Sequence, residues 1–211
     1  MALVERRREQ FVSAAVSLFA SKGFYRTTVQ DIAQKSGISA GLIYQYARTK
    51  EDVLLLSLLS VLQSYKDEIP KALQGVADPI LRLWGAIDAY VRVIDRHRAA
   101  TVLAYRSTKS LPKNQQELVK AAELETNELI KECLQKCMDA KLVSTPDIEL
   151  SVYLFVMFAH SWALKHWRLN SFMNIDAFIN NGFELLITGM LTPLGQRKYE
   201  ALKASRNQVS D

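Results

Sequence analysis

The stretch TVQDIAQKSGISAGLIYQY, residues 28–46, decides the fold of this chain. Its apolar spacing predicts a short helix over about residues 29–35, which ends where Gly37 permits a tight turn. Ser39 is a good N-cap for a further short helix, from Ala40 to about Tyr46. Two short helices joined by a glycine turn are typical of a helix-turn-helix, whose second helix enters the major groove of DNA.

A longer helix precedes this pair. Residues 5–21 are amphipathic, with apolar side chains at steps of three and four along one face, namely Phe11, Ala14, Ala15, Leu18 and Phe19. Lys22-Gly23 closes the helix, because glycine suits the left-handed residue that follows a helix. Either Thr27 or Thr28 can cap the next helix. The first fifty residues therefore read as a three-helix DNA-binding head.

The last helix of this head has an inner and an outer face. Ile43 and Ala47 point inward, which leaves on or near the outer surface Ala40, Gly41, Tyr44, Gln45 and Tyr46. The small residues Ala40 and Gly41 let the backbone approach DNA, and Gln45 can hydrogen-bond a base edge, most naturally that of adenine. Tyr44, Lys50 and Thr28, the last at a helix N-terminus, suit phosphate groups.

The head resembles that of a known family. Its pattern is similar, nearly position for position, to the N-terminal signature of TetR/AcrR regulators, at Phe11, Ala14, Ala15, Leu18, Phe19, Gly23, Phe24, Thr27, Thr28, Ile32, Ala33, Ser36, Gly37, Ile38, Ser39, Gly41, Ile43, Tyr44, Tyr46, Lys50 and Glu51. The match covers about residues 5–55, and it departs at Ala47, where the family usually has Phe. The resemblance implies a homodimer that binds double-stranded DNA at a palindromic operator.

The resemblance also assigns roles to residues. It implies that phosphate groups are contacted by Thr28, Ser39, Gly41, Tyr44 and Lys50. It places at the recognition surface Ala40, Gln45 and Tyr46. Core packing remains the alternative for Tyr44 and Tyr46. The run Arg6-Arg7-Arg8 is either an N-terminal arm on DNA or a solvated helix start.

Charge is divided unevenly along the chain. Residues 1–50 hold eight basic and three acidic residues, a net charge of +5, which equals the net charge of all 211 residues. A local basic excess is expected of a module that contacts phosphate. We therefore expect a DNA-binding domain at residues 1–50 and a helical effector-binding and dimerisation domain at residues 51–211.

The composition favours an all-α protein. The chain is 49% hydrophobic, with only 8 Gly and 5 Pro. Residues 152–159 form the longest apolar run, far shorter than the roughly 20 residues of a membrane span. The charged N-terminus does not read as a signal peptide, so we expect a cytoplasmic protein that does not contact a membrane. Cys133 and Cys137 share one helix face, and we interpret them as small core residues, with a metal or redox pair as the alternative.

Beyond residue 50 the pattern predicts long helices and few loops. They cover about residues 50–73, a segment opening at Asp78-Pro79, and then 99–109, 113–140, 146–168 and 175–191. Because residues 152–159 are apolar all round, we expect them to be buried from several sides. In the family the last two long helices form the dimer interface. We expect the polar tail from Gln196 to be frayed.

A ligand pocket is expected between these helices. Its candidates place aromatic or polar tips on apolar helices, and they are Trp84, Tyr90, Tyr105, Arg106, His160, Trp162 and Trp167. Core packing is the alternative for each, and a surface ion pair is the alternative for Arg106. His160 is the strongest candidate, because an ionisable ring beside an apolar run needs a partner.

The sequence offers no motif of an enzyme. It contains no glycine-rich phosphate loop, zinc-protease pair or serine elbow, so we predict no catalysis, metal or cofactor. We predict a dimeric repressor that a small effector releases from its operator. The segments 43–53 and 105–112 resemble those of TetR members that respond to acyl-CoA or other lipid catabolites. A drug-like aromatic effector, or a DNA-bound adaptor without any effector, is the alternative.

Overall fold

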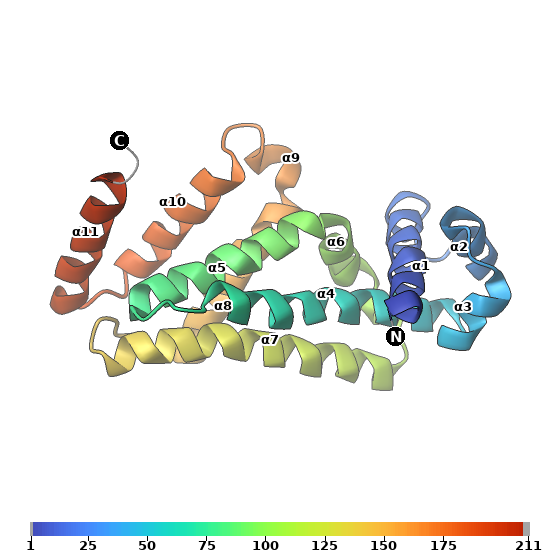
Figure 1. The fold of residues 1–211 in the computed structure, drawn as a ribbon, viewed down its shortest axis with the longest axis horizontal. Coiled ribbons are helices and arrows are strands. Elements are labelled where there is room, and N and C mark those ends of the chain that lie inside the picture. The colour runs from blue at the N-terminus through green and yellow to red at the C-terminus, as the bar shows by residue number, and fades with distance from the viewer. Residues whose placement is uncertain (1, 209–211) are drawn as a thin grey trace. The chain divides into compact units, whose positions relative to one another are not determined.

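The computed structural model describes the backbone of residues 2–208 and the side chains of residues 6–205. The described residues form helices and turns, with no strand beyond one isolated bridge between Val143 and Leu191, which confirms the all-α prediction. The helices are α1 (Ala2–Ser21), α2 (Val29–Ser36), α3 (Ala40–Tyr46), α4 (Lys50–Ala72), α5 (Pro79–Arg96), α6 (Arg98–Ser107), the 3-10 helix η1 (Thr108–Ser110), α7 (Lys113–Asp139), α8 (Ile148–Leu164), α9 (His166–Leu169), α10 (Ile175–Thr188) and α11 (Pro193–Gln208), as shown in Figure 1.

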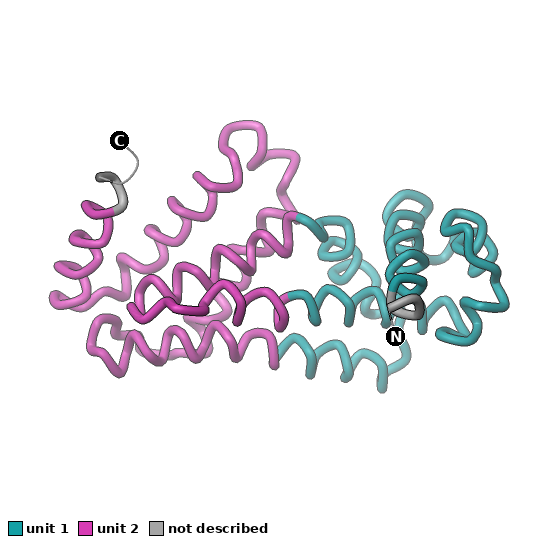
Figure 2. The backbone as a smooth tube through the Cα atoms, viewed as in Figure 1, with its two compact units in different colours: residues 1–64, 96–124 teal, residues 65–95, 125–211 magenta. Residues whose placement is uncertain are grey.

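The chain divides into two compact units (Figure 2). Unit 1 comprises residues 1–64 and 96–124, and unit 2 comprises residues 65–95 and 125–211. The helix-turn-helix head thus shares its unit with the first part of α4, with α6 and with the start of α7. A functional boundary at residue 50 stays a prediction, because the division into compact units does not fall at that residue.

Local signals build the head as the sequence predicts. Thr28 caps α2 by accepting from the amide of Asp31, and the Asp31 carboxylate accepts from the amide of Thr28 in return. Gly37 ends α2 in the left-handed region, with a φ of 67°. Ser39 caps α3 through the amide of Leu42. These bonds fix the turn between the two helices, because each satisfies a backbone group that a helix end leaves open.

The apolar faces of these helices meet in the core of unit 1. Buried side chains of α1, α2 and α3 pack there with others from α4, α6 and α7, among them Phe11, Phe19, Ile32, Ile43, Ala47, Leu54, Leu103 and Val119. Ala47, the departure from the family pattern, is fully buried at the end of α3. The core of unit 1 therefore joins the head to segments more than fifty residues away in the chain.

In unit 2, helices α8 and α10 pack closely. Phe158 stacks on Phe178, with ring centroids 4.4 Å apart. A Cβ atom at Gly182 would lie 2.0 Å from the Phe158 ring, so a glycine is needed there. Helix α5 has a buried apolar stripe that includes Ile80, Ile87, Val91 and Ile94, while Trp84 is only half-buried.

Two expectations about this unit are not met by the single chain. The outer face of α8 is exposed, at Leu150, Tyr153, Leu154 and Met157, so the chain alone does not bury residues 152–159 from several sides. These residues recur at steps of three and four, so one face of the helix is left uncovered.

The tail from Gln196 is not frayed either, because residues 193–208 form α11. Thr192 accepts from the amide of Gly195 and donates to the carbonyl of Lys141, and Pro193 takes the first helical position. Lys198 also pairs with Asp78 at 2.7 Å. None of the helices in the described part is long and apolar enough to span a membrane.

Candidate functional site

The outer face of α3 is open to solvent. Ile43 anchors the helix in the core, and the side chains of Tyr44 and Gln45 lie exposed on the opposite side, together with Gly41. Ala40 is half-buried at the first helical position. The N-terminal end of α3 therefore presents small residues, an amide and a phenol, groups that can reach the edges and phosphates of DNA.

Tyr46 lies differently from the other candidates on α3. Its ring is half-buried and packs against Phe11, with centroids 5.7 Å apart. This contact holds α3 against α1 and uses one side of the ring. The side chain thus supports the recognition helix in addition to any contact with DNA.

The Thr28 hydroxyl caps α2 by accepting a hydrogen bond from the Asp31 amide. Asp31 completes the cap, and a hydrogen bond from Lys22 at 2.6 Å, with those from Thr28, lowers the pKa of Asp31 to about 2. The carboxylate therefore stays charged at any physiological pH. The cap fixes the exposed end of α2. A contact between Thr28 and a phosphate therefore has to form with the cap bond still in place.

Lys50 is tied to the turn between α1 and α2. Its Nζ donates to the carbonyl oxygens of Phe24 at 3.3 Å and of Tyr25 at 3.1 Å, and it lies 4.7 Å from the centroid of the Phe24 ring. These groups are 25 and 26 residues away in the chain, so local sequence patterns do not predict the contact. In the structure Lys50 fixes the start of α4 to that turn.

Two further hydrogen bonds join the head to η1 and α7. The hydroxyl groups of Tyr25 and Ser110 lie 3.0 Å apart. Asp52 caps α4 through the amides of Arg48 and Thr49 and accepts from the Gln115 amide at 2.7 Å. Burial raises the pKa of Asp52, but the hydrogen bond from Gln115 and those from the cap outweigh it, so the net pKa is lowered. The carboxylate is held charged at this joint.

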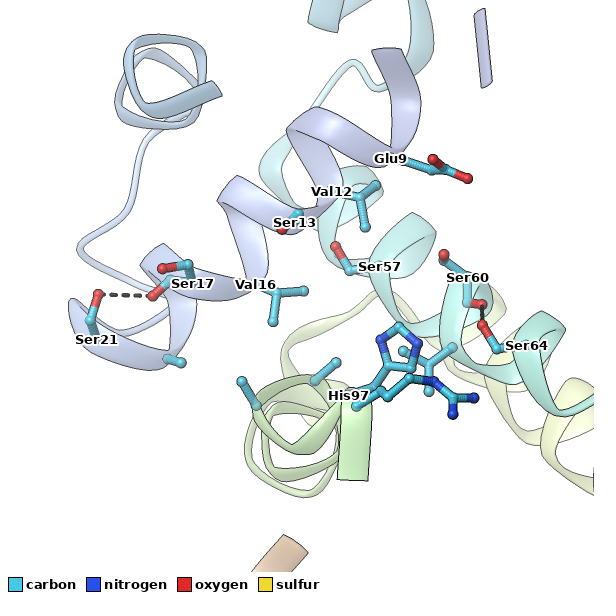
Figure 3. A pocket seen from close by; sticks show the side chains of 15 residues that line it. Glu9, Val12, Ser13, Val16, Ser17, Ser21, Ser57, Ser60, Ser64 and His97 are labelled. Atoms are coloured by element: carbon cyan, nitrogen blue, oxygen red, sulfur yellow. Dashed lines mark hydrogen bonds between the residues drawn. The ribbon is translucent and has the colours of Figure 1, made fainter. Parts of the chain in front are cut away.

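A groove of about 790 Å³ lies between α1, α4 and the start of α6 (Figure 3). Its lining is rich in small side chains, with six serines at Ser13, Ser17, Ser21, Ser57, Ser60 and Ser64. Glu9, Arg96 and His97 supply its charged and ionisable groups. The serines recur at steps of three and four on α1 and α4, so the spacing in the sequence already places each set on one helix face.

Two of the predicted ligand residues contact each other in the core of unit 2. The Tyr90 hydroxyl lies 3.3 Å from Nε2 of His160, and the Tyr90 ring stacks on Tyr65 with centroids 4.2 Å apart. Burial lowers the pKa of His160 to about 4, so the ring is neutral at physiological pH. Tyr65, fully buried on α4, was not among the predicted residues.

The remaining candidates lie on several helices. Trp162 is buried and donates to Asp95 at 2.8 Å, and Trp84 donates to Asn180 at 3.2 Å beside a cavity of about 30 Å³. Trp167 is 78% exposed on α9. In unit 1, Tyr105 and Arg106 are exposed on α6. A shared ligand pocket for these residues stays a prediction.

Tyr105 has an acidic neighbour. Burial of its hydroxyl, with the Glu123 carboxylate nearby, raises the pKa of Tyr105 to about 12. Burial also raises the pKa of Glu123. The tyrosine is therefore a neutral hydrogen-bonding group on the surface of α6.

The two cysteines lie in the core of unit 2. Both thiols are free and buried, and burial raises the pKa of Cys133 and brings that of Cys137 to about 12. Thiols in this state are poor nucleophiles and poor metal ligands. Within the residues that the structure describes, no group of three or more His, Cys, Asp or Glu side chains could hold a metal ion.

Known proteins share this architecture. The family described as "Bacterial regulatory proteins, tetR family" matches residues 11–56, and a "Tetracyclin repressor-like, C-terminal domain" matches residues 76–167. The HTH-type transcriptional regulator HbdR of Aromatoleum sp. (strain CIB) is 42% identical over 92% of this chain and 85% of its own length. The HTH-type transcriptional repressor KstR2 of Mycobacterium tuberculosis is 35% identical over 47% of this chain and 50% of its own length.

Solved structures show the same fold. A regulatory protein in the tetR family from Rhodococcus RHA1 superposes with a TM-score of 0.77 at 20% identity, covering 86% of this chain and 95% of the other. The transcriptional regulator FadR from Bacillus subtilis, in complex with stearoyl-CoA, gives a TM-score of 0.74 at 16% identity, covering 86% and 98%. With its helix-turn-helix head, its helical remainder and these relatives, the chain belongs to the TetR family of bacterial transcriptional regulators.

Proposed function

We propose that this regulator is a dimeric repressor, which a small lipophilic or acyl-CoA-like effector releases from a palindromic operator. The observation that carries the DNA-binding part is the exposed face of α3, which is held by caps at both of its neighbouring turns. Base edges would meet Ala40 and Gln45, and phosphates would meet Thr28, Ser39, Gly41 and Tyr44. A bacterial regulator of this kind works in the cytoplasm, where the chromosome lies.

The dimer would form through the uncovered face of α8. Leu154 and its exposed neighbours make an apolar stripe on this helix, and Leu185 of α10 is 81% exposed. Because α8 and α10 already pack on each other, a second copy would complete a four-helix interface. We expect Leu154→Glu to yield monomers in sedimentation velocity, while Leu124→Glu, at an exposed leucine of α7, leaves the dimer intact.

The effector class is supported by relatives. Acyl-CoA fits the stearoyl-CoA complex of the structural neighbour FadR, and a "Fatty acid metabolism regulator protein" of Bacillus subtilis is 27% identical to this chain over 42% of its length. The contact between Tyr90 and His160 marks the part of unit 2 where we place the effector. An adaptor without an effector would show operator binding that no compound changes.

Release from the operator would act through the contacts that connect the head to α6, η1 and α7 within unit 1. Helix α6 contacts α1, and the pairs Tyr25–Ser110 and Asp52–Gln115 connect η1 and α7 to the head. A shift of these segments would move α1, and the groove between α1, α4 and α6 gives α1 room to move. The two recognition helices of a dimer would then no longer match successive major grooves.

The test uses the exposed face of α3. We expect Gln45→Ala to weaken binding to the operator by about 5- to 150-fold, from the loss of a base contact of about 1–3 kcal/mol, and to leave binding to unrelated DNA unchanged. Tyr44→Phe should weaken both equally, because phosphate contacts carry no sequence information. Tyr105→Phe, at an exposed tyrosine of α6, is the matched control outside the DNA-binding head. If the wild type and the three variants bind the operator with equal affinity at fixed salt, the proposed interface is refuted.

A further inference from the structure

One buried side chain in unit 2 has no partner for its polar atoms. Asn127 on α7 is 5% exposed, and neither its amide oxygen nor its amide nitrogen has a hydrogen-bond partner among the described residues. Gln115, Arg82 and His166 also have one buried atom each without a partner. Hydrogen bonds from their other atoms hold Gln115 and Arg82, and the His166 ring is only half-buried and packs on Trp162. Asn127 therefore needs a group that the chain itself does not provide.

The cost of this arrangement argues against a purely structural role. A buried amide without partners destabilises the folded chain, whereas leucine has nearly the same size and leaves no polar group unsatisfied. The neighbours Thr126 and Ile130 are fully buried, so α7 has a well-packed face at this level. An asparagine at this position is understandable if something binds to it.

The ion pair between Lys66 and Glu125 places α4 beside α7 at this level. Asn127 follows Glu125 by two residues, and Tyr65 immediately precedes Lys66. Tyr65 stacks on Tyr90, and the Tyr90 hydroxyl reaches His160. Unit 2 thus carries buried hydrogen-bonding groups on four helices, at Tyr65, Tyr90, Asn127 and His160, and His160 is neutral.

We propose that Asn127 is the polar anchor of the effector site and binds a hydroxyl group on an otherwise apolar effector. This inference rests on the proposed function, in which an acyl-CoA-like effector enters unit 2. An amide offers one acceptor and two donor hydrogens, and a hydroxyl group complements both because it donates and accepts. A carboxylate would only accept, and the neutral His160 ring would give it no countercharge.

The test compares full-length wild type with Asn127→Leu. Binding of butanoyl-, octanoyl- and benzoyl-CoA is measured by calorimetry against the same thioesters carrying one hydroxyl group on the acyl part. We expect the wild type to bind at least one hydroxylated thioester 10-fold or more tightly than its parent, and the variant to bind both within about twofold. The unliganded variant should also melt at or above the temperature of the wild type.

A matched control removes an amide that does have a partner. Asn180 accepts from Trp84, so Asn180→Leu should lower the melting temperature and keep the preference for the hydroxylated thioester. Thioesters that bind without a hydroxyl preference, or a preference that survives Asn127→Leu, would overturn the role of Asn127 and leave the proposed function standing. Failure of every thioester to bind would overturn the acyl-CoA effector, and the inference with it.

Discussion

Replacement of Lys50 by Met tests the joint between the head and α4. The change removes two hydrogen bonds from the ammonium group, at 3.1 and 3.3 Å, and its contact with the Phe24 ring. Hydrogen bonds to a charged group contribute about 1.5–3 kcal/mol, and an exposed cation–π contact about 0.5–1 kcal/mol. Because Lys50 is half-buried and methionine keeps the apolar stem, we expect a loss of about 2 kcal/mol in local stability.

Hydrogen exchange measures this loss where it occurs. Opening of the segment 24–47 should become easier, so its amides should exchange roughly 30-fold faster in Lys50→Met, while peptides of unit 2 are unchanged. Lys35→Met is the control, because it removes an exposed lysine of α2 with the same change of charge. Equal protection of segment 24–47 in wild type and Lys50→Met would refute the structural role of this lysine.

Operator binding separates the two roles of Lys50. If the lysine acts only by fixing the turn, Lys50→Met lowers affinity and leaves the dependence of log affinity on log salt unchanged. If it also contacts a phosphate, the slope falls by about 0.9. A variant that binds the operator as tightly as the wild type would contradict both roles.

Three further changes test other parts of the fold. Gly37→Ala should cost about 1–2 kcal/mol, since the backbone there is left-handed; unchanged hydrogen exchange in α2 and α3 would contradict this. The unfolded chain binds a proton at His160 near its usual pKa of 6.5, but the folded chain does so only near 4, so stability should fall as pH drops from about 6.5 to 4. Urea unfolding of His160→Gln should lack this part of the pH dependence, and an identical profile would show that His160 is not its source. Thr192→Ala removes the cap of α11 and should cost about 1 kcal/mol, and exchange in α11 as slow as in the wild type would disprove the cap.

The head could be predicted because its signals are local. Thr28, Gly37 and Ser39 each act on backbone groups within three or four residues, so their roles can be predicted from neighbouring residues in the sequence. The inward positions Ile43 and Ala47 follow from helical periodicity alone. The structure confirms all of these assignments.

Contacts between distant segments could not be predicted in this way. Helix α11 is capped by Thr192 and tied to Asp78 by Lys198, and neither the Lys141 carbonyl nor Asp78 is near it in the chain. Lys50 contacts carbonyl groups about 25 residues away, and the stack of Tyr65 on Tyr90 exists only once α4 and α5 have packed. A polar residue in an apolar stripe indicates a special site, but the sequence does not show which groups will surround it.

The central claim is that an effector controls DNA binding by this protein. The most direct test is its affinity for DNA from the region upstream of its own gene, at fixed salt, with and without a panel of acyl-CoA thioesters. We predict tight binding that one thioester class weakens by a factor of 10 or more. Tight binding that every thioester leaves unchanged would contradict the proposed effector, and the absence of sequence-specific binding would contradict an operator in that region.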